Sequence, residues 1–189
     1  MTAPRLPKLS PADLDEPQRA LYDAIASGPR ARGPQLFALT DDAGHLEGPF
    51  NAMLLSPPLG GALQALGSAV RYSSGLADRD REIAILVVAH GWDCAFEVYA
   101  HEAVGRAAGL GDGDLAALRA GDYEQLAEHD RLVANTSAAL VVRSALTDDE
   151  FVAARDALGL RLLFELTTLV GYYATLALQL RVFDVSTPS

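Results

Sequence analysis

The feature that most constrains the fold is the run from Ile83 to Val88, in which all six residues are apolar. A helix that is apolar on every side belongs at the centre of a helical domain. Gly91-Trp92-Asp93 interrupts the segment a few residues later. Gly91 suits the left-handed end of one helix, and Asp93 suits the N-cap of the next. We therefore expect a central helix, a tight turn and a second helix folded back on it.

The rest of the chain also favours helices. Half of the 189 residues are hydrophobic, Ala and Leu dominate, and few segments alternate as strands do. Thr147 and Glu150 form a capping box before one helix, and a strongly apolar helix is expected from Leu160 to Val182. We predict an all-α fold in a single domain, with an N-terminal arm and helix over residues 1–43 and the main helical domain over residues 44–185.

Charge and composition exclude several classes of partner. The formal net charge of −10 disfavours nucleic acid and anionic membranes. A single cysteine forms no intramolecular disulfide and fits a reducing compartment. The N-terminus has no apolar signal segment, and no segment has the roughly 18 uninterrupted apolar residues of a membrane span. We expect a cytoplasmic protein that acts on a small-molecule substrate.

Five polar residues in the predicted helix–turn–helix are the candidate catalytic groups. They are Glu82, His90, Cys94, Glu97 and His101. Titratable groups are expensive to bury, so their presence in an otherwise apolar hairpin points to chemistry.

The second helix places three of these residues on one face. Cys94, Glu97 and His101 are spaced by three and four residues. Cys94 is expected at the first helical position, where the helix dipole lowers a thiol pKa. Glu97 and His101 are spaced as a carboxylate–imidazole pair, which can move a proton near neutral pH.

Plainer explanations exist for each group. Cys94 could be a small buried hydrophobe, His90 a helix C-cap, and Glu82 a partner of a neighbouring arginine. His90, Glu97 and His101 could also bind zinc or iron, but their spacing is not that of the helical H-E-x-x-H motif. We expect no metal and no cofactor.

The residues quoted next resemble a known family. The segment from Arg79 to Leu110 contains R-x-R-E-I-A-I-L-V-V-A-x6-F-E-x3-H-E-x3-R-A-A-G-L and resembles the carboxymuconolactone decarboxylase superfamily, which includes the alkyl hydroperoxidase D-like proteins. The stretches from Gly44 to Pro57 and from Leu169 to Tyr173 resemble a longer branch of it. The resemblance implies an alkyl hydroperoxidase D-like helical bundle that forms a homo-oligomer, a trimer or hexamer with a dimer as the alternative.

The resemblance also shows what this chain lacks. The peroxidase branch carries E-x11-C-x2-C-x3-H, in which the second cysteine attacks peroxide and the first resolves it. Glu82, Cys94 and His101 fall on the Glu, the first Cys and the His, but Glu97 stands where the second Cys would be. A dithiol relay needs two sulfurs, so this branch lacks the C-x-x-C chemistry.

Three functions therefore remain open. The leading one is a cofactor-free enzyme that decarboxylates or isomerises a small organic acid or lactone, with Glu97 and His101 as acid and base, His90 assisting and Glu82 orienting. Candidate substrate-binding residues are Arg71, Arg79 or Arg81, which could hold a carboxylate, and Trp92. The alternatives are a one-cysteine peroxidase acting through Cys94 and a non-catalytic binding protein.

Overall fold

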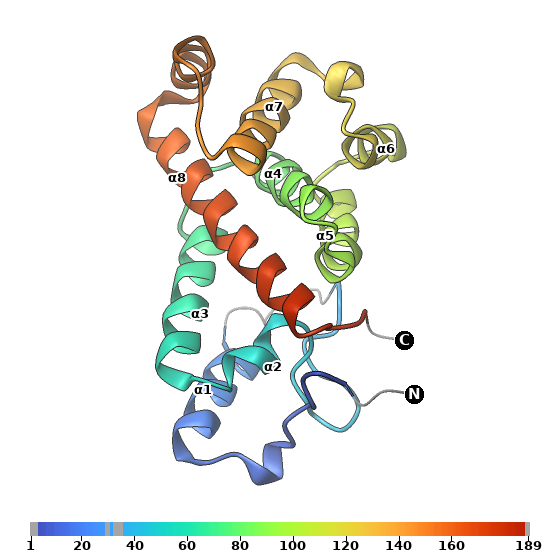
Figure 1. Cartoon of the computed structure of the whole chain (residues 1–189), viewed down its shortest axis with the longest axis vertical. Helices are drawn as coiled ribbons and strands as arrows, with labels where there is room; N and C mark the ends of the chain where they lie inside the picture. Colours follow the sequence, from blue (N-terminus) through green and yellow to red (C-terminus); the bar gives the residue numbers. More distant parts are fainter. Residues whose placement is uncertain (1–3, 29–30, 32–35, 188–189) are drawn as a thin grey trace.

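The computed structural model describes residues 4–28, 31 and 36–187, and in this part of the chain every regular element is a helix (Figure 1). The all-α prediction is confirmed. The elements are η1 (Pro11–Asp13), α1 (Glu16–Ala26), α2 (Pro49–Met53), α3 (Pro57–Tyr72), α4 (Asp78–Gly91), α5 (Ala95–Ala107), α6 (Asp112–Ala120), η3 (Tyr123–Gln125), α7 (Glu128–Arg143) and α8 (Asp148–Val182).

Helix α4 is the centre of the bundle, as its sequence predicts. Every residue from Glu82 to Ala89 is at most 3% exposed. The helix packs against α5, α6, α7 and α8, and α8 crosses the bundle diagonally beside it (Figure 1). Because neighbours surround α4, its apolar residues are buried on all sides.

The turn between α4 and α5 differs from the prediction. Gly91 stays helical, Asp93 is the left-handed residue with φ of 49°, and Cys94 is the N-cap of α5, not its first helical residue. The reason lies in packing: a Cβ on Gly91 would lie 2.8 Å from Cγ1 of Val141. Gly91 therefore allows α7 to approach closely, and Asp93 makes the turn.

Helix α8 is interrupted where its sequence indicates. Gly159 has φ of 79° and ψ of 159°, so an arm from 148 to 158 meets the long segment from 160 to 182 at an angle. The capping box of Thr147 and Glu150 starts the arm. The long segment places Leu166, Leu169 and Leu176 in the core.

The N-terminal part shares this core. Helix α1 packs on α3, and its Leu21 and Ile25 belong to the same hydrophobic cluster as the α4 residues. After α1, the chain returns through a bridge between Thr40 and Leu46 to α2. The two ends of the described chain lie near each other (Figure 1), where Arg5 donates to the Val182 carbonyl.

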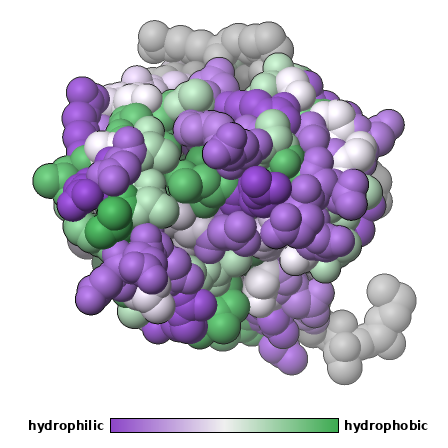
Figure 2. All heavy atoms as spheres, turned by 90° about the horizontal axis from the view of Figure 1, so that it is seen from above, coloured by the Kyte–Doolittle hydropathy of each residue, from purple (hydrophilic) through white to green (hydrophobic). Residues whose placement is uncertain are grey.

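The surface is mainly polar at the end of the molecule shown in Figure 2, where hydrophobic residues form small separate patches. In the described part of the chain, no helix combines the length and apolarity that crossing a bilayer requires.

Candidate active site

A buried carboxylate–imidazole pair joins the two central helices. Glu82 on α4 is 0% exposed and His101 on α5 is 4% exposed. The turn at Trp92–Cys94 folds the helices together, so that Nδ1 of His101 donates to Oε2 of Glu82 over 2.6 Å. Glu82 therefore contacts the second helix through His101.

His101 also faces a second carboxylate. Its Nε2 lies 3.4 Å from Oε2 of Glu97, one turn earlier on α5. Burial disfavours a charged imidazole, but the charges of Glu82 and Glu97 and their contacts with the ring outweigh it and raise the pKa of His101 to about 9. Near neutral pH the site therefore holds an imidazolium between two carboxyl groups.

Glu97 has one oxygen to spare. Its side chain is buried, and among the described residues Oε1 has no hydrogen-bond partner. The second oxygen of Glu82 is also without a hydrogen bond in this part of the chain, although Nε of Arg81 lies 3.7 Å away and Nη1 of Arg71 3.8 Å away. A buried acceptor without a donor is costly, so such an atom marks a place for a ligand or water.

A small cavity of about 20 Å³ adjoins Glu97 and His101. Its walls come from the loop before α2 and from α2, α3, α5 and α8. The lining residues are Phe37, Pro49, Phe50, Arg71, Phe96, Glu97, Ala100, His101, Tyr172, Tyr173 and Leu176. The wall is mostly aromatic and apolar, with three charged or titratable groups of the predicted set in it.

Two tyrosines that we did not predict as site residues form one side of this cavity. The ring of Tyr173 meets that of His101 edge to face at 5.1 Å, and Tyr172 packs on Tyr173 at 5.2 Å. Their position at the middle of an apolar helix is the signal in the sequence. Which face of that helix they occupy depends on how α8 crosses α5.

Arg71 on α3 brings a positive charge to the cavity. Burial disfavours its charge, but Tyr173, Glu82 and Tyr72 outweigh the burial and raise the pKa of the guanidinium. Arg71 therefore stays charged, and it is the predicted carboxylate-binding residue that reaches the cavity.

The other predicted substrate-binding residues lie elsewhere. Arg79 bonds to Asp130 on α7, Asp114 on α6 and the Gly109 carbonyl, so its guanidinium ties three elements together. Trp92 packs against the core while its carbonyl accepts from Arg181. Neither lines the cavity.

Cys94 lies apart from the reactive groups. It is 2% exposed, in a small apolar cluster with Phe96, Ala100, Ala177 and Leu180. Burial raises the pKa of the thiol despite the nearby amide groups of Glu97 and Phe96, and the Glu97 charge adds to the rise. The prediction of a lowered thiol pKa is therefore wrong, because desolvation outweighs the helix N-terminus.

His90 is not brought to the cluster. It sits half-buried at the end of α4, and the charges that act on it are those of Glu102 and Arg119. Burial lowers its pKa most strongly. The structure thus brings together Glu82, Glu97, His101 and Arg71, but places Cys94 and His90 outside the cavity wall.

The residues present do not suggest a metal centre. Among the described residues, no three His, Cys, Asp or Glu side chains gather in a metal-binding arrangement. Both ring nitrogens of His101 already face carboxylate oxygens.

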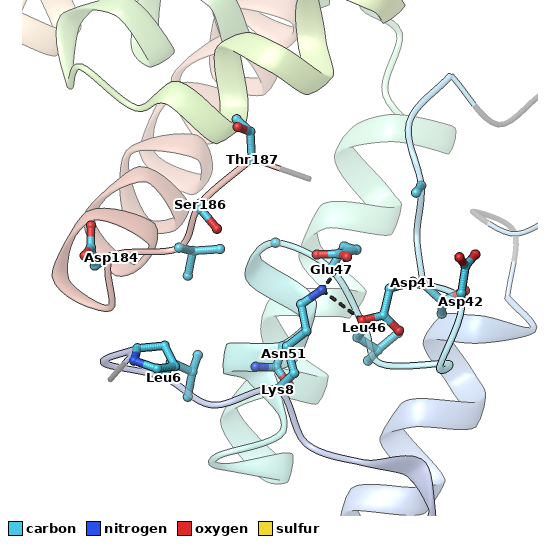
Figure 3. A pocket seen from close by; sticks show the side chains of 15 residues that line it. Leu6, Lys8, Asp41, Asp42, Leu46, Glu47, Asn51, Asp184, Ser186 and Thr187 are labelled. Carbon is cyan, nitrogen blue, oxygen red and sulfur yellow. Dashed lines mark hydrogen bonds and ion pairs between the residues drawn. The ribbon is translucent and has the colours of Figure 1, made fainter. Parts of the chain in front are cut away.

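A larger hollow of about 660 Å³ lies between the N-terminal arm, the loop before α2 and the C-terminal tail (Figure 3). Its one lysine, Lys8, points to two carboxylates, with Nζ 2.9 Å from Asp41 and 2.5 Å from Glu47 (Figure 3). The positive charge of Lys8 is thus already paired with two carboxylates of the hollow. The candidate residues Arg71, Glu97 and His101 line the smaller cavity instead.

The fold and this site define a class: all-helical proteins with a buried Glu–His–Glu set on a central helical hairpin. The family model of the carboxymuconolactone decarboxylase family matches residues 57–148, from α3 to the start of α8. Together with the structural likeness given next, this match supports an assignment of the chain to the carboxymuconolactone decarboxylase and AhpD-like superfamily.

The structural likeness covers the whole chain. The crystal structure of an alkylhydroperoxidase AhpD core, an uncharacterized peroxidase-related protein from Ralstonia eutropha JMP134, superposes with a TM-score of 0.77 at 14% identity. The match covers 100% of this chain and 94% of that one, and at this identity it shows the fold alone. No curated protein matches the sequence significantly.

Proposed function

We propose that this protein is a cofactor-free enzyme that moves a proton at carbon in a small organic acid or lactone. The observation that carries the proposal is the free oxygen of Glu97 at the cavity. A buried carboxylate oxygen that accepts no hydrogen bond can accept a proton from a substrate. His101, itself bonded to Glu82, holds the Glu97 side chain in place.

Each polar group has a role in this chemistry. Arg71 binds the carboxylate or lactone carbonyl of the substrate. Glu97 takes the proton from a neighbouring carbon and returns it to another carbon in an isomerisation. In a decarboxylation the electron pair of the broken C–C bond stays on carbon as CO₂ leaves. That carbon then takes the Nε2 proton of His101, relayed through Glu97, and solvent restores the proton on His101. Glu82 orients His101 and keeps it charged, and this charge stabilises the Glu97 carboxylate.

A peroxidase acting through Cys94 has less support. The thiol is buried, its pKa is raised, it lies outside the cavity wall, and it is the one cysteine in the chain. A thiol that stays protonated is a poor nucleophile. Thiol-dependent peroxide consumption should therefore be at background in the wild type and in Cys94→Ser alike.

The second candidate is a non-catalytic binding protein, which the size of the cavity favours. About 20 Å³ holds roughly one water molecule. An organic acid enters only if the aromatic wall moves. Catalysis on an organic acid thus requires the aromatic wall to open, whereas binding of a water-sized ligand does not.

Proton transfer can be tested without knowing the product. A panel of β-keto acids and unsaturated lactone carboxylates is incubated with the protein in D₂O, and deuterium incorporation at carbon is followed by NMR. We expect Glu97→Gln to lower the rate by roughly 100-fold or more, because the amide cannot accept the proton. Glu102→Gln is the matched control, since it makes the same change on α5 outside the cavity wall.

The outcomes separate the two candidates. Full activity in Glu97→Gln would contradict the proposed role. No exchange or turnover of any panel compound by the wild type, together with no binding of them, would support the binding protein for water-sized ligands instead.

A further inference from the structure

The outer face of α8 is apolar and uncharged along its length. From Leu160 to Val182 the residues on this face are Leu160, Phe164, Thr167, Gly171, Thr175, Leu178 and Val182. All are exposed, with Phe164 at 70% and Leu160 at 64%. Two carboxylates lie beside this face: Glu165 is bonded to the Gly75 amide and to Arg161, and Asp148 lines the hollow next to Leu160 and Phe164.

Gly171 lies at the middle of this face, and no close approach within the described part of the chain requires a glycine there. A Cβ there would meet nothing within 4 Å. Glycine in a helix interior disfavours the helix, and its usual compensation is the close approach of another backbone. The described residues supply no such neighbour, so the space over Gly171 suits a helix from outside.

The face is symmetric about Gly171. Leu160 and Val182 lie eleven residues on either side of it, Phe164 and Leu178 seven, and Thr167 and Thr175 four. With 3.6 residues per turn, all of them project within roughly 40° of the Gly171 direction. A sequence that reads alike in both directions fits an antiparallel copy of itself, as a twofold interface requires.

We propose that two copies of this chain associate through α8, antiparallel, with the twofold axis at Gly171. The two glycines meet at the centre, and each Phe164 lies level with the partner's Leu178. The twofold axis is perpendicular to the plane that contains both helices, so the two helices run in opposite directions. A side chain above this plane on one helix therefore has its symmetry mate above the plane on the other.

A pocket stands where this arrangement needs one. Leu178 lies on the same side of the helix as Leu160 and Thr167. Because the partner's Leu178 is level with Phe164, it lies on that side at a height between Leu160 and Thr167. A hollow of about 480 Å³ opens there, lined by residues that include Leu146, Phe151, Leu160, Leu163, Phe164 and Thr167. The hollow is large enough for a leucine side chain.

The exposed apolar area is close to what a stable dimer needs. Phe164, Leu160, Val182, Leu178, Phe151 and Leu66 are between 39% and 70% exposed. At on the order of 100 Å² each they offer roughly 600 Å² per copy, against ~800 Å² per partner in a stable interface. The threonines and Gly171 add to this area. The uncharged face also limits repulsion between two chains of net charge −10.

The test is the mass of the full chain in solution, measured by sedimentation velocity over a range of concentrations. Wild type should sediment at twice the monomer mass of 20.0 kDa, or at an even multiple of it. Gly171→Glu places two like charges at the axis, while its Cβ meets nothing within 4 Å in the monomer. It should raise the dimer dissociation constant by roughly 100-fold or more.

Gly113→Glu is the matched control. Gly113 lies on α6, also with nothing within 4 Å of a Cβ, so the same change there should leave the mass unaltered. Equal thermal unfolding of both variants at low concentration excludes a folding defect as the cause.

A second variant locates the axis. Gly171→Cys should give a covalent dimer on mild oxidation, because the twofold brings the two positions within disulfide reach, whereas Gly113→Cys should not. A monomeric or trimeric wild type, an assembly that Gly171→Glu leaves intact, or no cross-link through position 171 would each overturn the proposal.

Discussion

The buried pair of Glu82 and His101 makes a quantitative prediction about stability and pH. The pKa of His101 rises from 6.5 in the unfolded chain to about 9 in the folded protein. At 1.36 kcal/mol per pKa unit, the proton on His101 contributes roughly 3 kcal/mol to the free energy of unfolding.

The sign follows from the direction of the shift. Because the folded pKa is the higher one, this contribution is fully present below pH 6.5 and is lost as the pH rises through 9. Between these values the free energy of unfolding should fall by about 3 kcal/mol. His90, whose pKa is lowered, has its effect below this window, and Cys94, whose pKa is raised from 9.0, has its effect above it.

Urea denaturation at a series of pH values between 6.5 and 9 measures this quantity. His101→Gln removes the titrating group, and Glu82→Gln removes the charge that raises its pKa, so both variants should show a much flatter pH dependence than wild type. Equal slopes in wild type and His101→Gln would refute the assignment of the buried imidazolium.

Two further changes test how the surroundings of the site are built. Arg79→Met should lower the free energy of unfolding, measured by urea denaturation, by about 3 kcal/mol, because it leaves the buried carboxylate of Asp130 without its cation. If Arg79 bound substrate instead, the main effect of the substitution would be a higher KM. Gly48→Ala should cost about 2–4 kcal/mol in thermal unfolding, because Gly48 has φ of 58° and a Cβ would lie 2.3 Å from the Phe96 ring. Gly44→Ala is the control, since φ is also positive at Gly44 but the atom nearest to an added Cβ is 3.4 Å away. An equal loss of stability in both variants would show that backbone strain, and not the clash with Phe96, causes the loss.

Local patterns carried much of the prediction. The all-apolar run after Glu82 predicted the central helix, and the capping box at Thr147 and the glycine at 159 predicted the limits of the helical arm before the last segment. The three- and four-residue spacing of Cys94, Glu97 and His101 predicted the Glu97–His101 contact correctly. These features depend on neighbours within one or two turns, so the sequence holds them directly.

The predicted lowering of the Cys94 pKa was wrong because it left out the desolvation of the thiol. A cysteine at a helix start has a lowered pKa only if solvent or a cation supports the thiolate, and Cys94 is enclosed by Phe96, Ala177 and Leu180. The apolar wall comes partly from α8, more than 80 residues away in the chain. No local pattern around Cys94 indicates it.

By itself, the sequence determined the helical class, the central hairpin and the contact between Glu97 and His101, because periodicity and spacing act within a few turns. Tertiary structure alone decided which groups from different helices face one another. The crossing of α3 and α8 over the hairpin brought Arg71, Tyr172 and Tyr173 to the cavity, and the packing of α6 and α7 on α4 directed Arg79 away from it. Such choices depend on how whole helices pack, and packing angles follow from contacts between residues far apart in the chain.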